Sequence, residues 1–293
     1  MLVMRPSPAR LPSPPRLLGW LLLCAQAGCA ASERFAYNRV DKAGSSTMIE
    51  LLAKLSRLNS FHLQVGQIFM PSTSVYERAL SHVPNHGAYV GHAGFLPSAP
   101  KDVKWINVVR EPISRWASQY YYYVDARTRL PKLVQKEIDK RKADSTCGCF
   151  ALEFNDCIRV RAARNCTLIE ALSQKAYFCA PRENCSTDEA LHNALERYEF
   201  IGLTEKLELT FRGLEKLMPS FFKGASSLYT NHTVHRRVTH KHNPLTNTSN
   251  TGNISQDVRS LFEQMDHYQE EKRFYDAVQK KFWEKVASLE LLS

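Results

Sequence analysis

A short turn rich in lysine, glycine and hydroxyl side chains is the first stretch of this chain that could bind an anion. It consists of Lys42, Ala43, Gly44, Ser45, Ser46 and Thr47, and a helical pattern of apolar residues follows it. Small residues ahead of a helix expose backbone N–H groups and the positive end of the helix dipole, and both attract phosphate. The lysine precedes the glycine, so this is not the P-loop consensus. The alternative is a plain strand-to-helix turn capped by Ser45 or Ser46.

Three further side chains could complete an anion site that also contains a base. His92 lies between Gly91 and Gly94, and glycines beside a histidine let a ligand approach closely. A neutral imidazole is a suitable base near neutral pH. Arg110 follows the most regular apolar run of the chain, and Ser118 lies on the helix predicted beyond it. The alternatives are a structural histidine, a capping or surface-paired arginine and an exposed serine.

The hydrophobic pattern predicts the elements that must position these residues. Apolar runs predict strands in the stretch that begins at Phe35 and at residues 61–69, 88–95, 103–109 and 200–203. Helical periodicity predicts helices at residues 48–58, 77–83, 113–124, 207–217 and 258–289, with Thr204 as a cap. Open α/β sheets bind ligands at the carboxyl ends of their strands, which is where Arg110 stands. We therefore expect one large α/β domain.

Charge and the N-terminal segment indicate a secretory-pathway protein with a polyanionic partner. The 293 residues carry a net charge of +10, which favours nucleic acid, an anionic membrane or a sulfated polysaccharide. Residues 1–34 read as a leader and short stem, either a signal peptide or a signal anchor, because arginines precede an apolar run from 17 to 31. Five N-glycosylation sequons agree; they begin at Asn165, Asn184, Asn231, Asn247 and Asn253. Residues 35–293 would then be lumenal, where nucleic acid is not the partner.

Six cysteines beyond the leader crowd into one segment. They are Cys147, Cys149, Cys157, Cys166, Cys179 and Cys185. Six cysteines allow many alternative pairings, among which spacing alone does not choose. An oxidising lumen favours disulfides over a zinc cluster, which would need convergent Cys and His pairs.

Two basic segments could gather a polyanion. They span residues 127–142 and 231–253, and their cations include Arg127 and Arg129 in the first and Arg236 and Arg237 in the second. The first could be only a solvated helix face, and the second only a flexible loop. The sharper interpretation is a polyanion-binding rim and a basic loop that closes over a nucleotide.

Together these features resemble the Golgi glycosaminoglycan uronyl 2-O-sulfotransferases, the family that includes heparan sulfate 2-O-sulfotransferase and uronyl 2-sulfotransferase. The matching stretches are residues 37–40 with Lys42, Gly91 with His92, 106–115 with Ser118, 177–179, 202–205 and 221–225. They span nearly the whole predicted lumenal part. Their joint order is more specific than any single stretch.

The resemblance implies a P-loop-like sulfotransferase fold, α/β with a central, mainly parallel sheet flanked by helices. It also implies 3′-phosphoadenosine 5′-phosphosulfate (PAPS) as co-substrate and no metal. The turn from Lys42 to Thr47 would hold the 5′-phosphosulfate, with Lys42 on the oxygen that becomes the leaving group. Arg110 and Ser118 would hold the 3′-phosphate. His92 would be the catalytic base that accepts the proton of a hexuronic acid 2-hydroxyl.

The resemblance extends to the acceptor and the cell compartment. The acceptor would be a heparan, chondroitin or dermatan sulfate chain, bound by Arg39, Arg127, Arg129, Arg236 and Arg237. The protein would be a single-pass type II protein of the Golgi membrane, or secreted if the leader is cleaved. The resemblance also implies that it can form a homotrimer. The implied disulfides pair Cys157 with Cys166 and Cys179 with Cys185, and they leave Cys147 and Cys149 as extra cysteines.

One departure from the family pattern keeps other functions open. Asp41 puts a carboxylate beside the anion-binding turn. With the short stem, this motivates a second hypothesis, a non-catalytic secreted heparin-binding protein. A nucleotide kinase is a third hypothesis, which the turn fits poorly.

Overall fold

The computed structural model describes residues 33–129, 147–149, 152–169, 172–181, 183, 185–231 and 253–292, and of residues 123–129 it describes the backbone alone. Residues 1–32 of the predicted leader and stem, the basic residues from 130 to 142 and the loop with Arg236 and Arg237 lie outside the described residues. Arg34, predicted as part of the stem, is instead the first residue of a strand.

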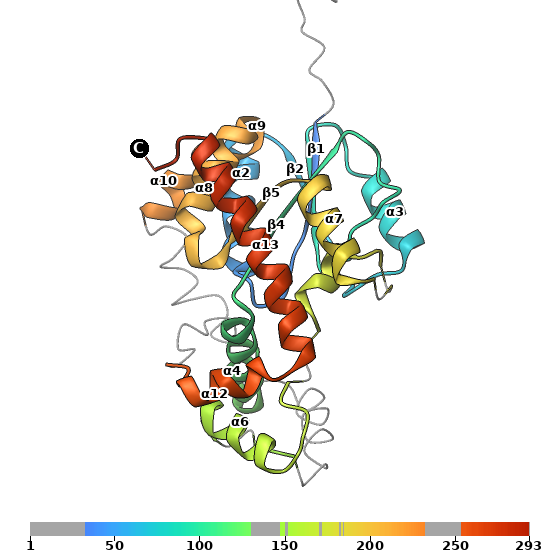
Figure 1. The fold of residues 1–293 in the computed structure, drawn as a ribbon. Coiled ribbons are helices and arrows are strands. Elements are labelled where there is room, and N and C mark those ends of the chain that lie inside the picture. Colours follow the sequence, from blue (N-terminus) through green and yellow to red (C-terminus); the bar gives the residue numbers. More distant parts are fainter. Residues whose placement is uncertain are drawn as a thin grey trace, which may run out of the picture.

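In the described part of the chain, five parallel strands form the central sheet, in the spatial order β2-β3-β1-β4-β5 (Figure 1). They are β1 (Arg34–Asn38), β2 (His62–Val65), β3 (Gly87–Gly91), β4 (Val103–Val109) and β5 (Tyr198–Leu203). The inner strands are apolar on both faces, as expected for a parallel sheet covered by helices, and every residue of β3 is buried. The predicted α/β fold with a central parallel sheet is confirmed.

Helices pack around this sheet and extend below one end of it (Figure 1). They are α2 (Ser45–Leu58), α3 (Thr73–Ser81), α4 (Pro112–Arg129), α6 (Phe154–Ala163), η1 (Gln174–Phe178), α7 (Thr187–Arg197), η2 (Thr204–Lys206), α8 (Leu207–Leu217), α9 (Pro219–Phe222), α10 (Ala225–Thr230), α12 (Gln256–Glu263) and α13 (Asp266–Ser288). The predicted positions of α2, α4 and α8 agree with the structure, whereas α3 begins four residues earlier than the predicted start at Glu77.

The helix predicted over residues 258–289 is two helices, because it serves two hydrophobic clusters. Val258 and Phe262 on α12 pack with Trp116 in a cluster to which α4 and α6 also contribute. Figure 1 shows these three helices below the sheet. Phe274 and Val278 on α13 pack in the main cluster against the sheet. The chain changes direction between the helices, where Met265 has extended backbone. Continuous periodicity concealed this break.

Thr204 does not cap α8 as predicted. Its hydroxyl donates instead to the carbonyl oxygen of Val109 at 3.0 Å, and the short helix η2 separates it from α8. Thr204 therefore joins the carboxyl ends of β5 and β4.

Three disulfides are formed among the six cysteines: Cys147 with Cys166, Cys149 with Cys157, and Cys179 with Cys185. The predicted bond between Cys179 and Cys185 is confirmed, and the predicted bond between Cys157 and Cys166 is wrong. Cys157 lies in the first turn of α6, whereas Cys166 lies beyond the end of that helix, so a rigid helix keeps the two apart. Cys147 and Cys149 are therefore not extra cysteines.

No helix in the described ranges has both the length and the apolar character that a membrane span requires. In the same ranges, no group of Cys, His, Asp and Glu side chains is arranged to hold a metal ion.

Candidate functional site

Three adjacent strands bring the predicted catalytic residues to one edge of the sheet. β1 lies between β3 and β4, and all three run in the same direction. Lys42, His92 and Arg110 follow these strands, so they all lie at the carboxyl edge, where α/β sheets bind ligands. The Arg39 N–H donates to the Gly91 carbonyl oxygen at 2.9 Å, which holds the segments after β1 and β3 side by side.

The turn after β1 presents the start of α2 without a side-chain cap. Lys42 and Gly44 both have left-handed backbone, with φ of 58° and 73°. Gly44 occupies the cap position, and no side chain there accepts from the helix, so the alternative of a cap by Ser45 or Ser46 is wrong. The N–H groups in the first turn of α2, which include that of Thr47, thus lack a capping side chain. Such N–H groups are the ones that bind phosphate.

Lys42 and Arg110 are joined across the site. Nη1 of Arg110 donates to the Lys42 carbonyl oxygen at 3.2 Å. Nζ of Lys42 lies 4.3 Å from the centre of the Tyr122 ring on α4. Burial lowers the pKa of the Arg110 guanidinium, while the negative charges of Glu205 and Glu111 raise it. The Arg110 guanidinium therefore lies against the backbone of the turn that carries Lys42, a position suited to an anionic ligand bound at that turn.

His92 is oriented by the backbone of the neighbouring segment. Its Nδ1 lies 2.9 Å from the Arg39 carbonyl oxygen. A carbonyl only accepts, so Nδ1 carries the proton and the lone pair is on Nε2. Rings of Phe69 and Tyr177 lie 5.4 and 6.4 Å from the imidazole, centre to centre. Burial, and next the charge of Arg39, lowers the pKa of His92 to about 4. The imidazole is therefore neutral at physiological pH.

Asp41, the residue that departs from the family pattern, does not face the anion site as a free carboxylate. Its Oδ1 accepts from Nη1 of Arg115 and from the Tyr177 hydroxyl, each at 3.1 Å. The Arg115 side chain has no exposed surface, and its Nη2 also donates to the Leu172 carbonyl oxygen at 2.6 Å. The negative charge beside Lys42 is thus compensated by a buried cation.

The remaining predicted residues divide into three groups. Ser118 is buried on α4, so the alternative of an exposed helix serine is wrong. Arg127 and Arg129 belong to α4, with only their backbone described, and Arg236 and Arg237 are outside the described residues. Arg39 is mostly buried, and its Nε has no hydrogen-bond partner among the described residues. A buried unpaired donor in this position is suited to an anionic ligand.

Sequence reasoning gave no role to two residues that hold the site together. Arg115 pairs with Asp41, and the side chain of Gln174 pairs with the backbone of Arg110. Arg115 does lie in the first turn of α4, a few residues beyond Arg110, and this position could have raised the question. Gln174 lies 64 residues from Arg110, and no local pattern could have indicated the contact.

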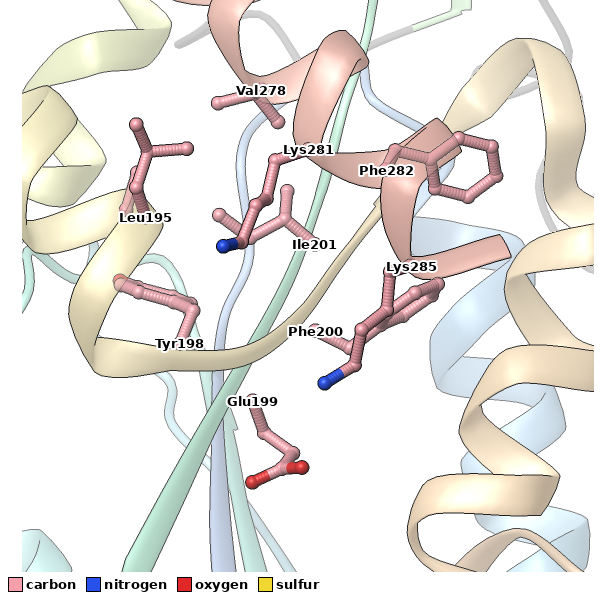
Figure 2. A pocket seen from close by; sticks show the side chains of 10 residues that line it. Leu195, Tyr198, Glu199, Phe200, Ile201, Val278, Lys281, Phe282 and Lys285 are labelled. Atoms are coloured by element: carbon pink, nitrogen blue, oxygen red, sulfur yellow. The ribbon is translucent and has the colours of Figure 1, made fainter. Parts of the chain in front are cut away.

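A pocket of about 180 Å³ lies elsewhere, between α7, β5 and α13. Figure 2 shows Lys281 and Lys285 of α13 above it and Glu199 below, with Phe200 and Phe282 among its apolar residues. None of the predicted site residues lines this pocket. It is separate from the carboxyl edge of the sheet.

Comparison with known proteins identifies the family of the chain. Residues 29–276 match the sulfotransferase family. The chain belongs to this family. The sulfotransferase is 26% identical over 266 residues to heparan sulfate 2-O-sulfotransferase 1 of Xenopus laevis and 27% identical over 268 residues to that of Homo sapiens. Each match covers 84% of this chain and 69% of the relative. A heparin sulfate O-sulfotransferase of Drosophila melanogaster is 26% identical over 224 residues, which is 69% of this chain and 61% of the relative.

Proposed function

We propose that this sulfotransferase transfers the sulfuryl group of PAPS to the 2-hydroxyl of a hexuronic acid in a glycosaminoglycan. The observation that carries the proposal is the common edge at which Lys42, Arg110 and His92 lie, with Arg110 bonded to the Lys42 backbone. Membership of the sulfotransferase family supports PAPS as donor. The names of the similar proteins support a heparan chain as acceptor, and chondroitin and dermatan chains remain in the proposal.

The donor end of the mechanism uses charge and backbone N–H groups. The first turn of α2 with Ser45, Ser46 and Thr47 would hold the 5′-phosphosulfate, and Lys42 would stabilise the charge that develops on the bridging oxygen. Gly44 has no side chain to cover that backbone, and Ala43, whose side chain is buried in the core, would contribute its backbone to the same turn. Arg110, with Ser118, would hold the 3′-phosphate. Most of these residues are partly buried, and this setting strengthens their interactions relative to water.

The acceptor end of the mechanism uses His92. Its Nε2 lone pair takes the proton of the 2-hydroxyl as that oxygen attacks sulfur. The bond from sulfur to the bridging oxygen breaks, and adenosine 3′,5′-bisphosphate leaves. The negative charge of a bound donor would raise the pKa of His92 above its value in the free protein, which strengthens the base when it is needed.

The acceptor chain and the cell compartment complete the proposal. Arg39 lies beside His92 through the backbone contacts described above, which supports a role for it at the acceptor. We extend that role to Arg127, Arg129, Arg236 and Arg237 because of their charge. We also propose Golgi membrane attachment through residues 1–34 and a lumenal domain over residues 35–293. A homotrimer is part of the same proposal.

One assay tests this function. The protein is incubated with sulfate-labelled PAPS and desulfated heparan, chondroitin or dermatan chains, followed by disaccharide analysis. We expect label on the uronic acid 2-position, and none with His92→Ala, which should still bind adenosine 3′,5′-bisphosphate. Full activity in His92→Ala would remove the assignment of the base. Retention on heparin with no transfer and no thermal shift with the bisphosphate would favour a non-catalytic heparin-binding protein.

A further inference from the structure

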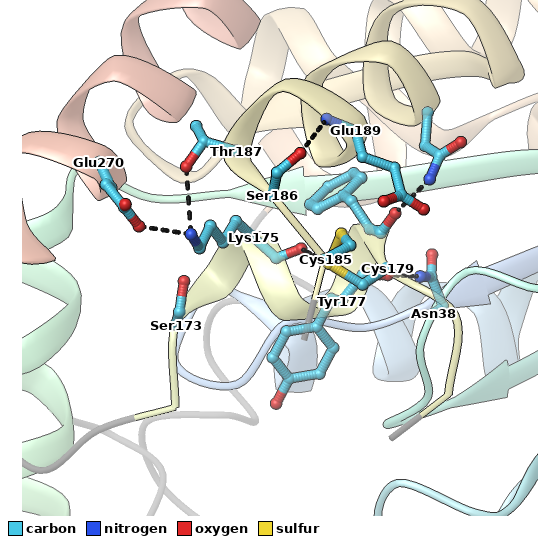
Figure 3. The surroundings of a disulfide bond; sticks show 12 residues. Asn38, Ser173, Lys175, Tyr177, Cys179, Cys185, Ser186, Thr187, Glu189 and Glu270 are labelled. Carbon is cyan, nitrogen blue, oxygen red and sulfur yellow. Dashed lines mark hydrogen bonds and ion pairs between the residues drawn. A yellow bond between two sulfur atoms is a disulfide. The ribbon is translucent and has the colours of Figure 1, made fainter. Parts of the chain in front are cut away.

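The short helix η1 contacts both the segment after β1, which contains Asp41 and Lys42, and the segment after β4, which contains Arg110. The carbonyl oxygen of Tyr177 accepts from the Asn38 side-chain amide at 2.6 Å, and its hydroxyl donates to Asp41 at 3.1 Å. Figure 3 shows Tyr177 and Asn38 beside the disulfide of Cys179 and Cys185 at the end of η1. The helix is thus attached to the end of β1 and to the turn that follows it.

The first residue of η1 reaches the end of β4. The Gln174 side-chain amide donates to the Arg110 carbonyl oxygen at 3.0 Å, and its Oε1 accepts from the Arg110 N–H at 3.3 Å. Gln174 is fully buried. Its amide pairs with both backbone groups of the residue that follows β4, as a neighbouring strand would. Backbone groups of a largely buried residue need such partners, since leaving them unpaired costs free energy.

A buried carboxylate on α13 holds Gln174 in turn. Glu271 has no exposed surface, and it accepts from the Ser173 hydroxyl and from the Gln174 N–H, the latter at 3.2 Å. Burial raises the pKa of Glu271, and the charges of Arg115 and Lys175 oppose that effect. A carboxylate that accepts N–H groups at the start of a helix fixes where the helix begins.

The neighbour of Glu271 acts on a different residue of η1. Nζ of Lys175 forms an ion pair with Glu270 and donates to the Thr187 hydroxyl at 3.1 Å (Figure 3). Glu270 does not contact Gln174 in any described interaction. Glu270 therefore anchors η1 through Lys175, whereas Glu271 holds Gln174 itself. Substitution of each glutamate can distinguish the two effects.

We propose that Gln174 is a positioning residue for Arg110, and that Glu271 fixes Gln174. The inference rests on the proposed function, in which Arg110 holds the donor 3′-phosphate. Gln174 bonds the backbone of Arg110, so it sets the direction of the guanidinium without touching the nucleotide. Its contribution should appear only with ligands that carry the 3′-phosphate.

Calorimetry with two nucleotides tests the role of Gln174. Gln174→Ala should weaken adenosine 3′,5′-bisphosphate binding about tenfold, because the backbone that carries the Arg110 guanidinium is then no longer pre-organised. It should leave binding of adenosine 5′-phosphate, which lacks the 3′-phosphate, nearly unchanged. In Arg110→Ala the same glutamine substitution should add little, because both act through one contact. Gln64→Ala is the matched control, since Gln64 bonds a backbone carbonyl on α3, away from the site.

A second pair of variants tests the role of Glu271. Glu271→Gln should weaken bisphosphate binding severalfold, whereas Glu270→Gln, which removes the neighbouring carboxylate, should not. Hydrogen exchange of the Arg110 N–H in the ligand-free protein should accelerate in Gln174→Ala. Unchanged bisphosphate affinity and exchange in Gln174→Ala would overturn the positioning role and leave the donor site standing. Absence of bisphosphate binding by the wild-type protein would overturn the proposed function and this role together.

Discussion

The guanidinium of Arg115 lies 3.1 Å from the carboxylate of Asp41 and is fully buried, so the two residues form an ion pair beneath the anion-binding turn. Removal of one partner from a buried pair leaves an uncompensated charge. We expect Asp41→Asn to lower the free energy of unfolding by about 3 kcal/mol or more in urea titrations.

An exposed ion pair provides the control for Asp41. Asp276 pairs with Lys272 on the surface of α13, so Asp276→Asn should change the free energy of unfolding by less than about 1 kcal/mol. Arg115→Met combined with Asp41→Asn should recover part of the lost stability, because no buried charge then remains unpaired. Equal losses for Asp41→Asn and Asp276→Asn would contradict the ion-pair role.

The depressed pKa of His92 predicts a pH dependence of stability. The imidazole titrates near its usual 6.5 in the unfolded chain and at about 4 in the folded protein. Between these values the unfolded chain binds more protons, so stability is fully present above pH 6.5 and falls as the pH approaches 4. Urea unfolding at several pH values should reveal about 3 kcal/mol of this dependence. His92→Gln should lack that component, and an identical pH profile in the variant would refute the burial effect.

Lys42 should matter to turnover more than to stability. Lys42→Ala should reduce the transfer rate by about a hundredfold to a thousandfold, because the proposed mechanism places the lysine on the leaving group in the transition state. It should also weaken bisphosphate binding. Lys54→Ala is the control, because Lys54 lies on α2 and pairs with Glu50 of that helix. It should leave the transfer rate and the bisphosphate affinity unchanged.

Two glycines with left-handed backbone allow the effect of backbone strain on stability to be distinguished from an effect on ligand binding. Gly44 and Gly224 both precede helices, with φ of 73° and 88°. At neither position would an added Cβ lie closer than 3.6 Å to a neighbour. Alanine at either position should therefore lower the free energy of unfolding by a similar amount, about 1 kcal/mol. Only Gly44→Ala should also weaken bisphosphate binding in calorimetry. Equal bisphosphate affinities in the two variants would show that the turn with Gly44 is not part of the donor site.

Peptide mapping checks the disulfide pattern. Digestion of unreduced protein should release peptides that link Cys147 to Cys166 and Cys149 to Cys157. A peptide that links Cys157 to Cys166 would restore the pairing inferred from the family. Loss of the Cys179–Cys185 bond should lower stability by about 2 kcal/mol, the entropy of closing so short a loop.

Short local sequence patterns predicted most strands of the sheet and the candidate site residues that follow them. Residues 103–109 form a nearly continuous apolar run, which predicts a strand. The turn from Lys42 to Thr47 consists of small residues directly before a helix, which predicts an anion-binding turn. Parallel strands then bring their carboxyl ends to one edge, so adjacency of Lys42, His92 and Arg110 follows from topology.

Contacts between distant segments could not be predicted from such patterns. Asp41 meets Arg115 across 74 residues, and Gln174 meets Glu271 across 97. Such pairs depend on how helices pack, which a single sequence does not encode as a periodic signal. The bond between Cys157 and Cys166, which the family resemblance implied, was wrong because α6 keeps these two cysteines apart.

The order of elements along the chain has a consequence for biosynthesis. α13 follows every strand of the described sheet, and it supplies Glu271 beneath η1 and the Tyr275 hydroxyl, which lies 3.3 Å from Glu205. Glu205 in turn accepts from the Glu111 N–H next to Arg110 at 2.9 Å. A nascent chain that has assembled its sheet before α13 packs onto it would carry every proposed donor-binding residue, but Gln174 and Glu205 would lack the α13 contacts that hold them beside the Arg110 segment.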